Sequence, residues 1–171
     1  MVIFFCIFRD FFKMKIIKKQ LVIFFVILII SITNSLAHEY KIGNLKILHP
    51  YIIETPPGAI TAGGYMKIVN TGNQNDHLSL VTVDFAKVCE IHEMKMENDM
   101  MKMREVKDEL EISAQSSVEL KHKGYHIMFM KLLKPMIKGE THEGTLYFEK
   151  AGNIKIIFTV EKMSFKLGDN S

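Results

Sequence analysis

The sequence predicts an all-β fold, arranged as an antiparallel sandwich or Greek-key barrel. Three observations point to this class. Short β-rich runs alternate with turn signals, no long segment of the chain after Ala37 has a helical period, and 171 residues are enough for one domain of ordinary size. Many short strands at this spacing are typical of sandwiches and barrels.

Nine strands are expected after Ala37, and turn residues separate them. Gly, Pro and Asn supply the backbone angles of tight turns, so their clusters mark where one strand ends and the next begins. The clusters are Pro56-Pro57-Gly58, Asn70-Thr71-Gly72-Asn73, Lys123-Gly124, Lys138-Gly139-Glu140 and Ala151-Gly152-Asn153. The expected strands cover residues 40–48, 64–70, 77–83, 88–94, 101–106, 117–121, 126–132, 145–149 and 154–161.

The N-terminal segment has the three parts of a secretory signal. Basic residues after Met14 precede an apolar run from Leu21 to Thr33, and small residues end at Ala37. We expect cleavage after Ala37, with Met14 as a candidate for the true start. The alternative is an uncleaved anchor, although the apolar run is shorter than the roughly 20 residues of a typical span. The expected division is a leader at 1–37, a β domain at 38–161 and a flexible tail at 162–171.

The charge of the exported part argues against nucleic acid as a partner. The chain has 22 Lys and Arg against 19 Asp and Glu, a net charge of +3. The leader holds five of these basic residues and one acidic residue, which leaves 17 basic and 18 acidic residues and a net charge of −1. Phosphate binding needs several uncompensated cations. Removal of the leader also removes Cys6, so Cys89 cannot form an internal disulfide, and we interpret it as a small core residue.

Histidine and methionine gather in two places. Five of the 12 methionines lie between Met94 and Met103, just after His92, and a second cluster reads His126-Ile127-Met128-Phe129-Met130. In a strand, side chains two residues apart share a face, so the histidine and both methionines of the second cluster would point the same way. The first cluster has polar residues between its methionines, which indicates an exposed hairpin or loop.

Thioether sulfur together with imidazole favours Cu(I) over Zn(II), Mg(II) or Ca(II), because both the sulfur and the ion are soft. A site without thiolate also survives better outside the cytoplasm and releases its metal more easily, which favours delivery over storage. Methionine is also a common gap-filler in cores. The alternative function is therefore a non-enzymatic periplasmic protein-interaction module with a Met-rich hydrophobic surface.

The order and spacing of these residues resemble the periplasmic copper chaperones called PCu(A)C. The family pattern is His, ten residues, Met, twenty-one or twenty-two residues, and then His-x-Met. Here ten residues separate His92 from Met103, twenty-two separate Met103 from His126, and Met128 closes the pattern. The phrases around both histidines are also similar to those of the family, and the resemblance spans roughly Leu45 to Val160.

The resemblance implies a cupredoxin-like antiparallel Greek-key barrel that binds one Cu(I) near its surface through His92, Met103, His126 and Met128. It implies a monomeric periplasmic metallochaperone that delivers copper toward the Cu(A) site of cytochrome c oxidase. The implied partner is subunit II of that oxidase or another copper carrier, with membrane contact only through an uncleaved leader. Some relatives hold a second copper, as Cu(II), on a His- and Met-rich extension, whereas the tail here offers only Met163.

Other residues could replace or extend this ligand set. Met94 and Met101 lie beside the expected ligands, and Met130 shares the face of Met128 as a wall of the site or as core. His38 would become the N-terminus after cleavage, where an α-amine and an imidazole can chelate Cu(II). Four more histidines are expected at the surface or in hydrogen bonds: His49, His77, His122 and His142.

No enzymatic motif competes with metal binding. Cys89 has no evident activating base, and Glu93 would point to the strand face opposite His92. Neither a nucleophile elbow nor a phosphate-binding glycine loop is present in the sequence. We therefore do not expect an enzyme.

Overall fold

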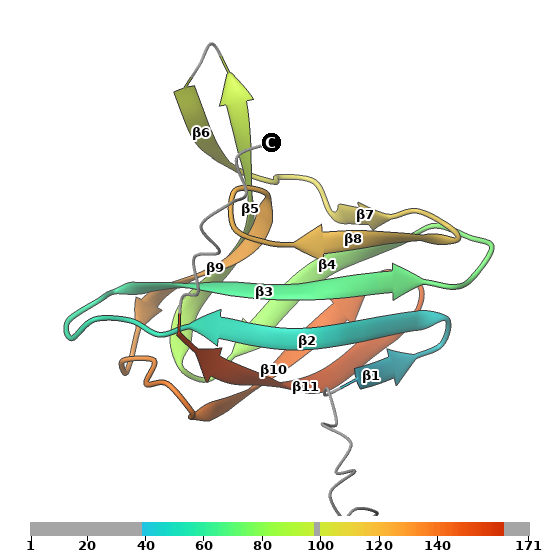
Figure 1. Ribbon diagram of the computed structural model, residues 1–171. Coiled ribbons are helices and arrows are strands. Elements are labelled where there is room, and N and C mark those ends of the chain that lie inside the picture. The colour runs from blue at the N-terminus through green and yellow to red at the C-terminus, as the bar shows by residue number, and fades with distance from the viewer. Residues whose placement is uncertain (1–38, 98–99, 163–171) are drawn as a thin grey trace, which may run out of the picture. The chain divides into compact units, whose positions relative to one another are not determined.

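Figure 1 shows a computed structural model of the chain, which describes residues 39–97 and 100–162. All regular structure in these two ranges is β-strand, which confirms the all-β prediction. Nor do these ranges contain any helix with the length and hydropathy of a membrane span. The strands are β1 (Glu39–Ile42), β2 (Leu45–Ile53), β3 (Thr61–Asn70), β4 (Asp76–Val83), β5 (Ala86–Glu97), β6 (Met100–Glu105), β7 (Leu110–Ile112), β8 (Ser116–Leu120), β9 (Tyr125–Leu132), β10 (Thr141–Phe148) and β11 (Gly152–Glu161).

The strands form one hydrogen-bonded sheet, in the order β6-β5-β9-β8-β3-β2-β11-β10-β4-β7. In addition, β1 pairs with β2, and β9 pairs with β3. Most neighbours are antiparallel, but β2 and β11 run parallel, as do β8 and β9. The sheet is therefore mixed, whereas the sequence indicated antiparallel pairing alone. The pairing of β2 with β11 joins the two ends of the domain, and no local turn signal encodes such a pair.

Alternate residues of the strands fill the core. In Figure 1, β2 and β3 lie in front of β4 and β10, and fully buried side chains from both groups of strands belong to one hydrophobic cluster. The ring of Phe129 on β9 lies edge-on to Phe85 and Phe158, with centroid distances of 5.0 and 5.6 Å. Such edge-to-face contacts add to the stabilisation from apolar burial.

The predicted strand at 40–48 is two strands, because Gly43 interrupts it. Gly43 has a φ of 54°, in the left-handed region that glycine adopts without steric cost. β1 and β2 therefore form a hairpin, with Tyr40 opposite Ile47. The short strand β7 had no sequence signal of its own, since three residues are too few to show an alternating pattern.

A bulge in β2 turns one aromatic side chain outward. His49 has a φ of 49°, and the register with β3 shifts between Leu48 and Tyr51. Before the bulge the odd-numbered residue Ile47 is buried, and after it the even-numbered residue Ile52 is buried. Because side chains alternate along a strand, the extra residue places Tyr51 on the outer face.

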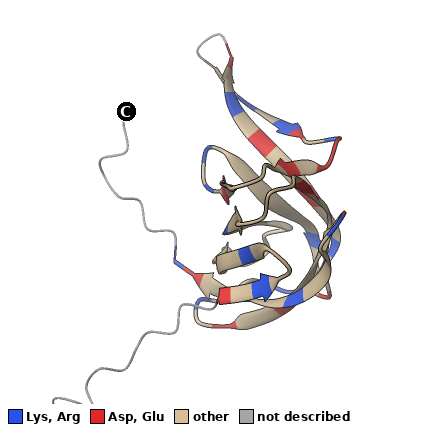
Figure 2. Ribbon diagram, turned by 90° about the vertical axis from the view of Figure 1, so that its right-hand side faces the viewer, with Lys and Arg blue, Asp and Glu red and all other residues tan. Residues whose placement is uncertain are grey.

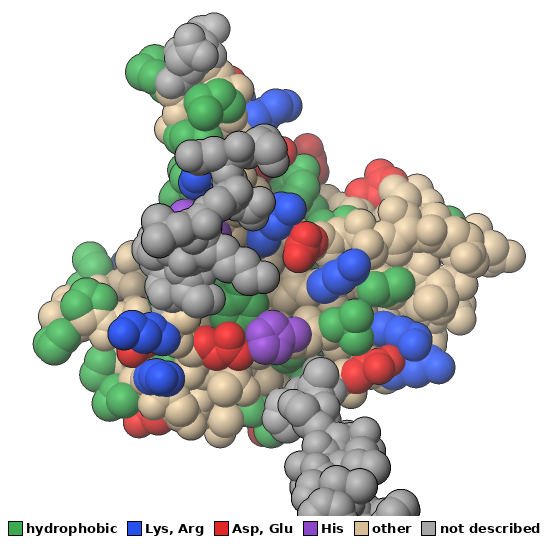
Figure 3. All heavy atoms as spheres, viewed as in Figure 1, with side chains coloured by type: hydrophobic (Ala, Val, Ile, Leu, Met, Phe, Trp, Pro, Cys, Tyr) green, Lys and Arg blue, Asp and Glu red, His purple; other side chains and the backbone are tan. Residues whose placement is uncertain are grey.

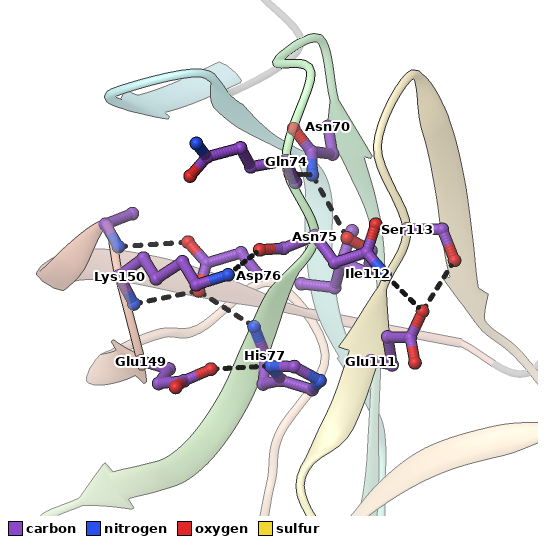
Figure 4. A network of polar contacts seen from close by, with 11 residues as sticks. Asn70, Gln74, Asn75, Asp76, His77, Glu111, Ile112, Ser113, Glu149 and Lys150 are labelled. Carbon is purple, nitrogen blue, oxygen red and sulfur yellow. Dashed lines mark hydrogen bonds and ion pairs between the residues drawn. The ribbon is translucent and has the colours of Figure 1, made fainter.

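A buried carboxylate ties the start of β4 to the turn between β10 and β11 (Figure 4). Asp76 Oδ1 accepts hydrogen bonds from the backbone N–H groups of His77 at 2.8 Å and Lys150 at 2.9 Å. Its Oδ2 accepts one from the N–H of Ala151 at 2.9 Å. Hydrogen bonds to a charged acceptor are among the stronger ones in proteins, so Asp76 anchors this end of the sheet.

Candidate metal centre

The strand β9 sorts its residues onto two faces. Ile127 and Phe129 are fully buried in the core, whereas His126, Met128 and Met130 lie on the other face. This confirms the alternation predicted from the sequence. The predicted ligands of β9 therefore lie on the outer face of the sheet, and its core residues hold the strand in place.

The two predicted histidine ligands face each other across neighbouring strands. His92 on β5 is paired directly with His126 on β9, and their ring centroids are 5.9 Å apart. Directly opposed residues of an antiparallel pair have side chains on the same face. The structure therefore brings together two imidazoles with 33 residues between them in the sequence.

The two predicted methionine ligands lie on either side of this histidine pair. Met128 is opposite Glu90, and Met103 on β6 is opposite Met94; both partners are two residues from His92 on β5. Residues two apart share a face, so all four predicted ligands lie on the outer face of β6, β5 and β9. Diagonal neighbours in a sheet are about 7–8 Å apart, which long side chains can span.

Met94 lies closer to the histidine pair along the sheet than Met103 does, because β5 lies between β6 and β9. It lies on the outer face two residues from His92, and it is directly opposite Met103. Met101 is one pair further along the hairpin, opposite Met96. Met130 lies at the other end of the face, opposite Val88, and is half-buried. Of the alternative ligands considered from the sequence, Met94 is therefore the best placed.

Backbone contact and burial prepare His126 as a neutral ligand. Its Nδ1 lies 3.0 Å from the carbonyl oxygen of Gly124, so the ring donates from Nδ1 and keeps its lone pair on Nε2. Burial lowers the pKa of His126, and the nearby charges of His92 and His122 lower it further, against the Gly124 hydrogen bond, which raises it. The imidazole is thus unprotonated near neutral pH, as metal binding requires.

His92 has one ring nitrogen with a partner and one without. Its Nε2 lies 2.9 Å from a carboxylate oxygen of Glu90, whereas Nδ1 is buried and has no hydrogen-bond partner within residues 39–97 and 100–162. The tautomer that donates from Nε2 to Glu90 leaves a lone pair on Nδ1. A buried polar atom without a partner is costly, and a metal ion would satisfy it. The donor atoms of both histidines therefore fit a bound cation.

A row of aromatic rings supports His126 from the side away from β5. Tyr65 on β3 stacks on His126 at a centroid distance of 6.4 Å, and Tyr51 stacks on Tyr65 at 5.2 Å. A Cβ added to Gly63 would lie 2.5 Å from the Tyr65 hydroxyl, so the absence of a side chain at Gly63 leaves room for this ring. Sequence reasoning missed both tyrosines as part of the site, because the bulge and the register bring them there.

The thiol of the described domain lies away from this face. Cys89 packs against the core, and burial raises the pKa of its thiol to about 11. It is therefore protonated near neutral pH and is a poor nucleophile or ligand. Glu93 is opposite Tyr125 and Arg104, on the face away from His92, as predicted.

The other histidines lie outside the site. His49 is exposed and lies 3.3 Å from Glu161. His77 Nδ1 is 2.7 Å from Glu149, and these two residues with Glu109 form an exposed N/O cluster that sequence reasoning missed. Such donors suit harder divalent ions than Cu(I). His122 is exposed, in the turn before β9.

His142 is buried, in contrast to the surface position that was one of its two expected environments. Its Nε2 forms an ion-pair contact of 3.4 Å with Glu140 but has no hydrogen-bond partner of good geometry among the described residues, and its ring contacts Phe85 at 5.1 Å. Burial lowers the pKa of His142, as does the charge of Lys134, while Glu140 and Asp84 raise it. The leader, His38 and Met163 lie outside the described residues.

No curated protein matches this chain. Among solved structures, it is similar to the copper-bound PCuAC domain from PmoF2, with 28% identity over 74% of this chain and 99% of that one and a TM-score of 0.63. The apo PCuAC domain from PmoF1 is 26% identical, over 74% and 100% of the chains, with a TM-score of 0.63.

Cu(I)-bound DR1885 from Deinococcus radiodurans shares the fold, with 23% identity over 77% of this chain and 86% of that one and a TM-score of 0.55. The LpqE-like lipoprotein family matches residues 45–160, which is more than half of the chain and includes β2 to β10 and nearly all of β11. This chain therefore belongs to the LpqE-like family, which is the PCuAC family.

Proposed function

We propose that the protein is a Cu(I)-binding metallochaperone and that four residues bind the ion: His92, Met103, His126 and Met128. The observation that carries this proposal is the cross-strand pair of imidazoles with a thioether on either side, all on one outer face. Two nitrogen and two sulfur donors without a thiolate suit Cu(I). The similarity to a copper-bound PCuAC domain supports it.

The exposure of the site favours transfer over storage. Met103 is 48% exposed and lies at the edge of the sheet, so a ligand from an acceptor can approach the ion from that side. Exchange of one ligand at a time moves a metal without releasing it into water. The protonated thiol of Cys89, on the opposite side of β5, does not compete for the ion.

The further steps of the proposal concern place and partner. The protein works in the periplasm after cleavage of the leader at 1–37, as a monomeric cupredoxin-like Greek-key domain at 38–161. It delivers Cu(I) toward the Cu(A) site of cytochrome c oxidase, to subunit II or to another copper carrier. It acts as a carrier and not as an enzyme. The leader and its cleavage rest on the signal pattern of the sequence, the non-enzymatic role rests on the lack of an enzymatic motif, and the delivery steps rest on the resemblance of the sequence to the PCuAC chaperones.

A Cu(I) titration against a competing chelator tests the central proposal. We expect one tight equivalent, which is lost when His126→Ala and Met128→Ala are combined. The matched control combines His49→Ala with Met100→Ala, which removes the same two residue types at exposed positions outside the site. X-ray absorption of the loaded protein should count two nitrogen and two sulfur neighbours.

The same titration separates this function from the alternative, a protein-interaction module with a Met-rich surface. The exposed methionines of the β5–β6 hairpin are the observation in favour of that alternative. Unchanged tight binding in the His126 and Met128 variant would reject the site as drawn. Absence of any tight equivalent in the unmodified protein would favour the interaction module.

A further inference from the structure

The end of the β5–β6 hairpin extends beyond the rest of the sheet (Figure 1). Pairing of β5 with β9 ends at Glu93, opposite Tyr125, while its pairing with β6 continues to Glu97, opposite Met100. Beyond Met94, β5 therefore has β6 as its one paired strand among the described residues. Each face carries an exposed methionine, since Met96 on one face and Met100 on the other are both 60% exposed.

One face of the extension is charged. Glu97 Oε2 accepts hydrogen bonds from Lys102 Nζ at 3.2 Å and from Arg104 at 2.6 Å. Figure 2 shows basic and acidic residues along both strands of the hairpin, at the top of the view. Met100, opposite Glu97, belongs to this charged face and is 60% exposed. The ion pairs hold the charged side chains to one another on this side.

Among the described residues of the extension, the other face carries thioethers alone. Met94 is directly opposite Met103, and Met96 is directly opposite Met101, so these four residues form a thioether face of two adjacent cross-strand pairs. Met96 is 60% exposed and Met101 is 41% exposed. Figure 3 shows hydrophobic side chains gathered on the projecting hairpin. Burial in the core therefore does not explain Met96 and Met101.

The geometry suits a soft ion. Directly opposed Cβ atoms lie about 4.5–5.5 Å apart, so two methionine side chains can converge on one ion between them. Successive residues on one strand face are about 6.6 Å apart, so the outer pair lies one such step from the inner pair that contains Met103. Thioethers are neutral and weakly hydrated, and they select soft monovalent cations.

We propose that Met96 and Met101, with Met94 beside them, form a second and weaker site for a soft monovalent cation, through which Cu(I) reaches or leaves the His–Met site. The proposal rests on the proposed function, since it requires the first site to take Cu(I). The ion keeps its charge and its oxidation state, and it moves as one thioether replaces another. The second site lacks imidazole, which accounts for its lower affinity.

A silver titration tests this inference, because Ag(I) is a soft monovalent ion that needs no reductant. The exported protein, labelled with ¹³C at the methionine methyl groups, is titrated with Ag(I) while NMR and native mass spectrometry follow the binding. The first equivalent should shift the methyl signals of Met103 and Met128. The second should shift those of Met96 and Met101, with an affinity weaker by about tenfold or more, as expected for a loss of roughly 1.4 kcal/mol of binding free energy.

Variants assign the second equivalent. Met96→Leu combined with Met101→Leu should abolish the second equivalent and change the affinity for the first by less than about twofold, because Leu and Met have similar volumes and both positions are exposed. Met100→Leu is the matched control: the residue is as exposed as Met96 but lies on the charged face, so both equivalents should remain. Retention of the first equivalent also reports that the variants are folded.

The outcomes separate this inference from the proposed function. The second site would be overturned, and the first left intact, if the second equivalent persisted in the Met96 and Met101 variant. The same would follow if Met100→Leu removed the second equivalent as completely as that variant does. A second equivalent that binds without any shift at Met96 and Met101 would do the same. If the unmodified protein lacked the first equivalent while the methyl signals of Met96 and Met101 still shifted, the proposed function would be rejected and the thioether site retained.

Discussion

Replacing Gly64 with alanine should destabilise the fold, although alanine normally suits a strand better than glycine does. A Cβ at this position would lie 2.5 Å from Cε2 and 3.0 Å from Cζ of Phe129. Carbon atoms in contact are about 3.5–4.0 Å apart, so the overlap is about 1 Å. Phe129 cannot move aside easily, because the rings of Phe85 and Phe158 lie against it.

The magnitude follows from overpacking in a closed core. Such changes cost about 1–3 kcal/mol, and the two flanking rings place Gly64→Ala at the upper end. For a domain of this size, a loss of about 2–3 kcal/mol lowers the Tm by roughly 10 °C. Urea denaturation and a thermal scan of the variant measure both values.

A double-mutant cycle identifies the clash as the cause. Phe129→Leu removes the ring atoms that the added Cβ would meet, so the Gly64→Ala change should cost at least about 1 kcal/mol less in that background. Gly124→Ala is the control, because its Cβ would meet Lys121 Cγ at 3.4 Å, the flexible part of an exposed side chain. A Gly64→Ala variant within about 0.5 kcal/mol of the unmodified protein, or strict additivity with Phe129→Leu, would refute this reasoning.

Three further predictions concern pH, anchoring and ligand choice. Because burial lowers the pKa of His142, the unfolded chain takes up its proton first, so the free energy of unfolding should fall as the pH drops below about 6.5. His142→Gln should reduce the change in urea midpoint between pH 7.5 and 5.5. An equal change in the variant and the unmodified protein would contradict this. Asp76→Asn should cost about 1–3 kcal/mol in urea denaturation, because its amide cannot accept all three backbone hydrogen bonds; a change below about 0.5 kcal/mol would count against the anchor. Met103→Ala should weaken Cu(I) binding in a chelator competition more than Met94→Ala does, and the reverse order would make Met94 the ligand.

The sequence was informative where a pattern is local. The alternation around His126 predicted correctly which side chains of β9 enter the core, because a strand repeats every two residues. The polar residues between Met94 and Met103 predicted an exposed hairpin or loop, and β5 and β6 form a hairpin. The placement of the four predicted ligands on one face agrees with the spacing pattern, while their role as copper ligands stays a prediction.

The remaining features depend on register, which no local pattern encodes. The facing of Met94 and Met103 depends on how β5 and β6 are aligned, and a shift of one residue would turn every side chain of the shifted strand to the other face. The outward position of Tyr51 depends on the bulge at His49, and the stacking of Tyr65 on His126 depends on long-range pairing. The burial of His142 follows from tertiary packing against Phe85.

The two-residue repeat of β9 has a consequence for how this protein can change. Residues 127 and 129 belong to the hydrophobic core, whereas His126, itself buried, and the half-buried Met128 point to the opposite face of the sheet. Under the proposed ligand assignment, substitutions at 126 and 128 would change the ion preference while the core residues keep the backbone in place. Such a strand would be a convenient starting point for engineering new coordination chemistry, because the side chains proposed to bind the ion are not those that pack the core.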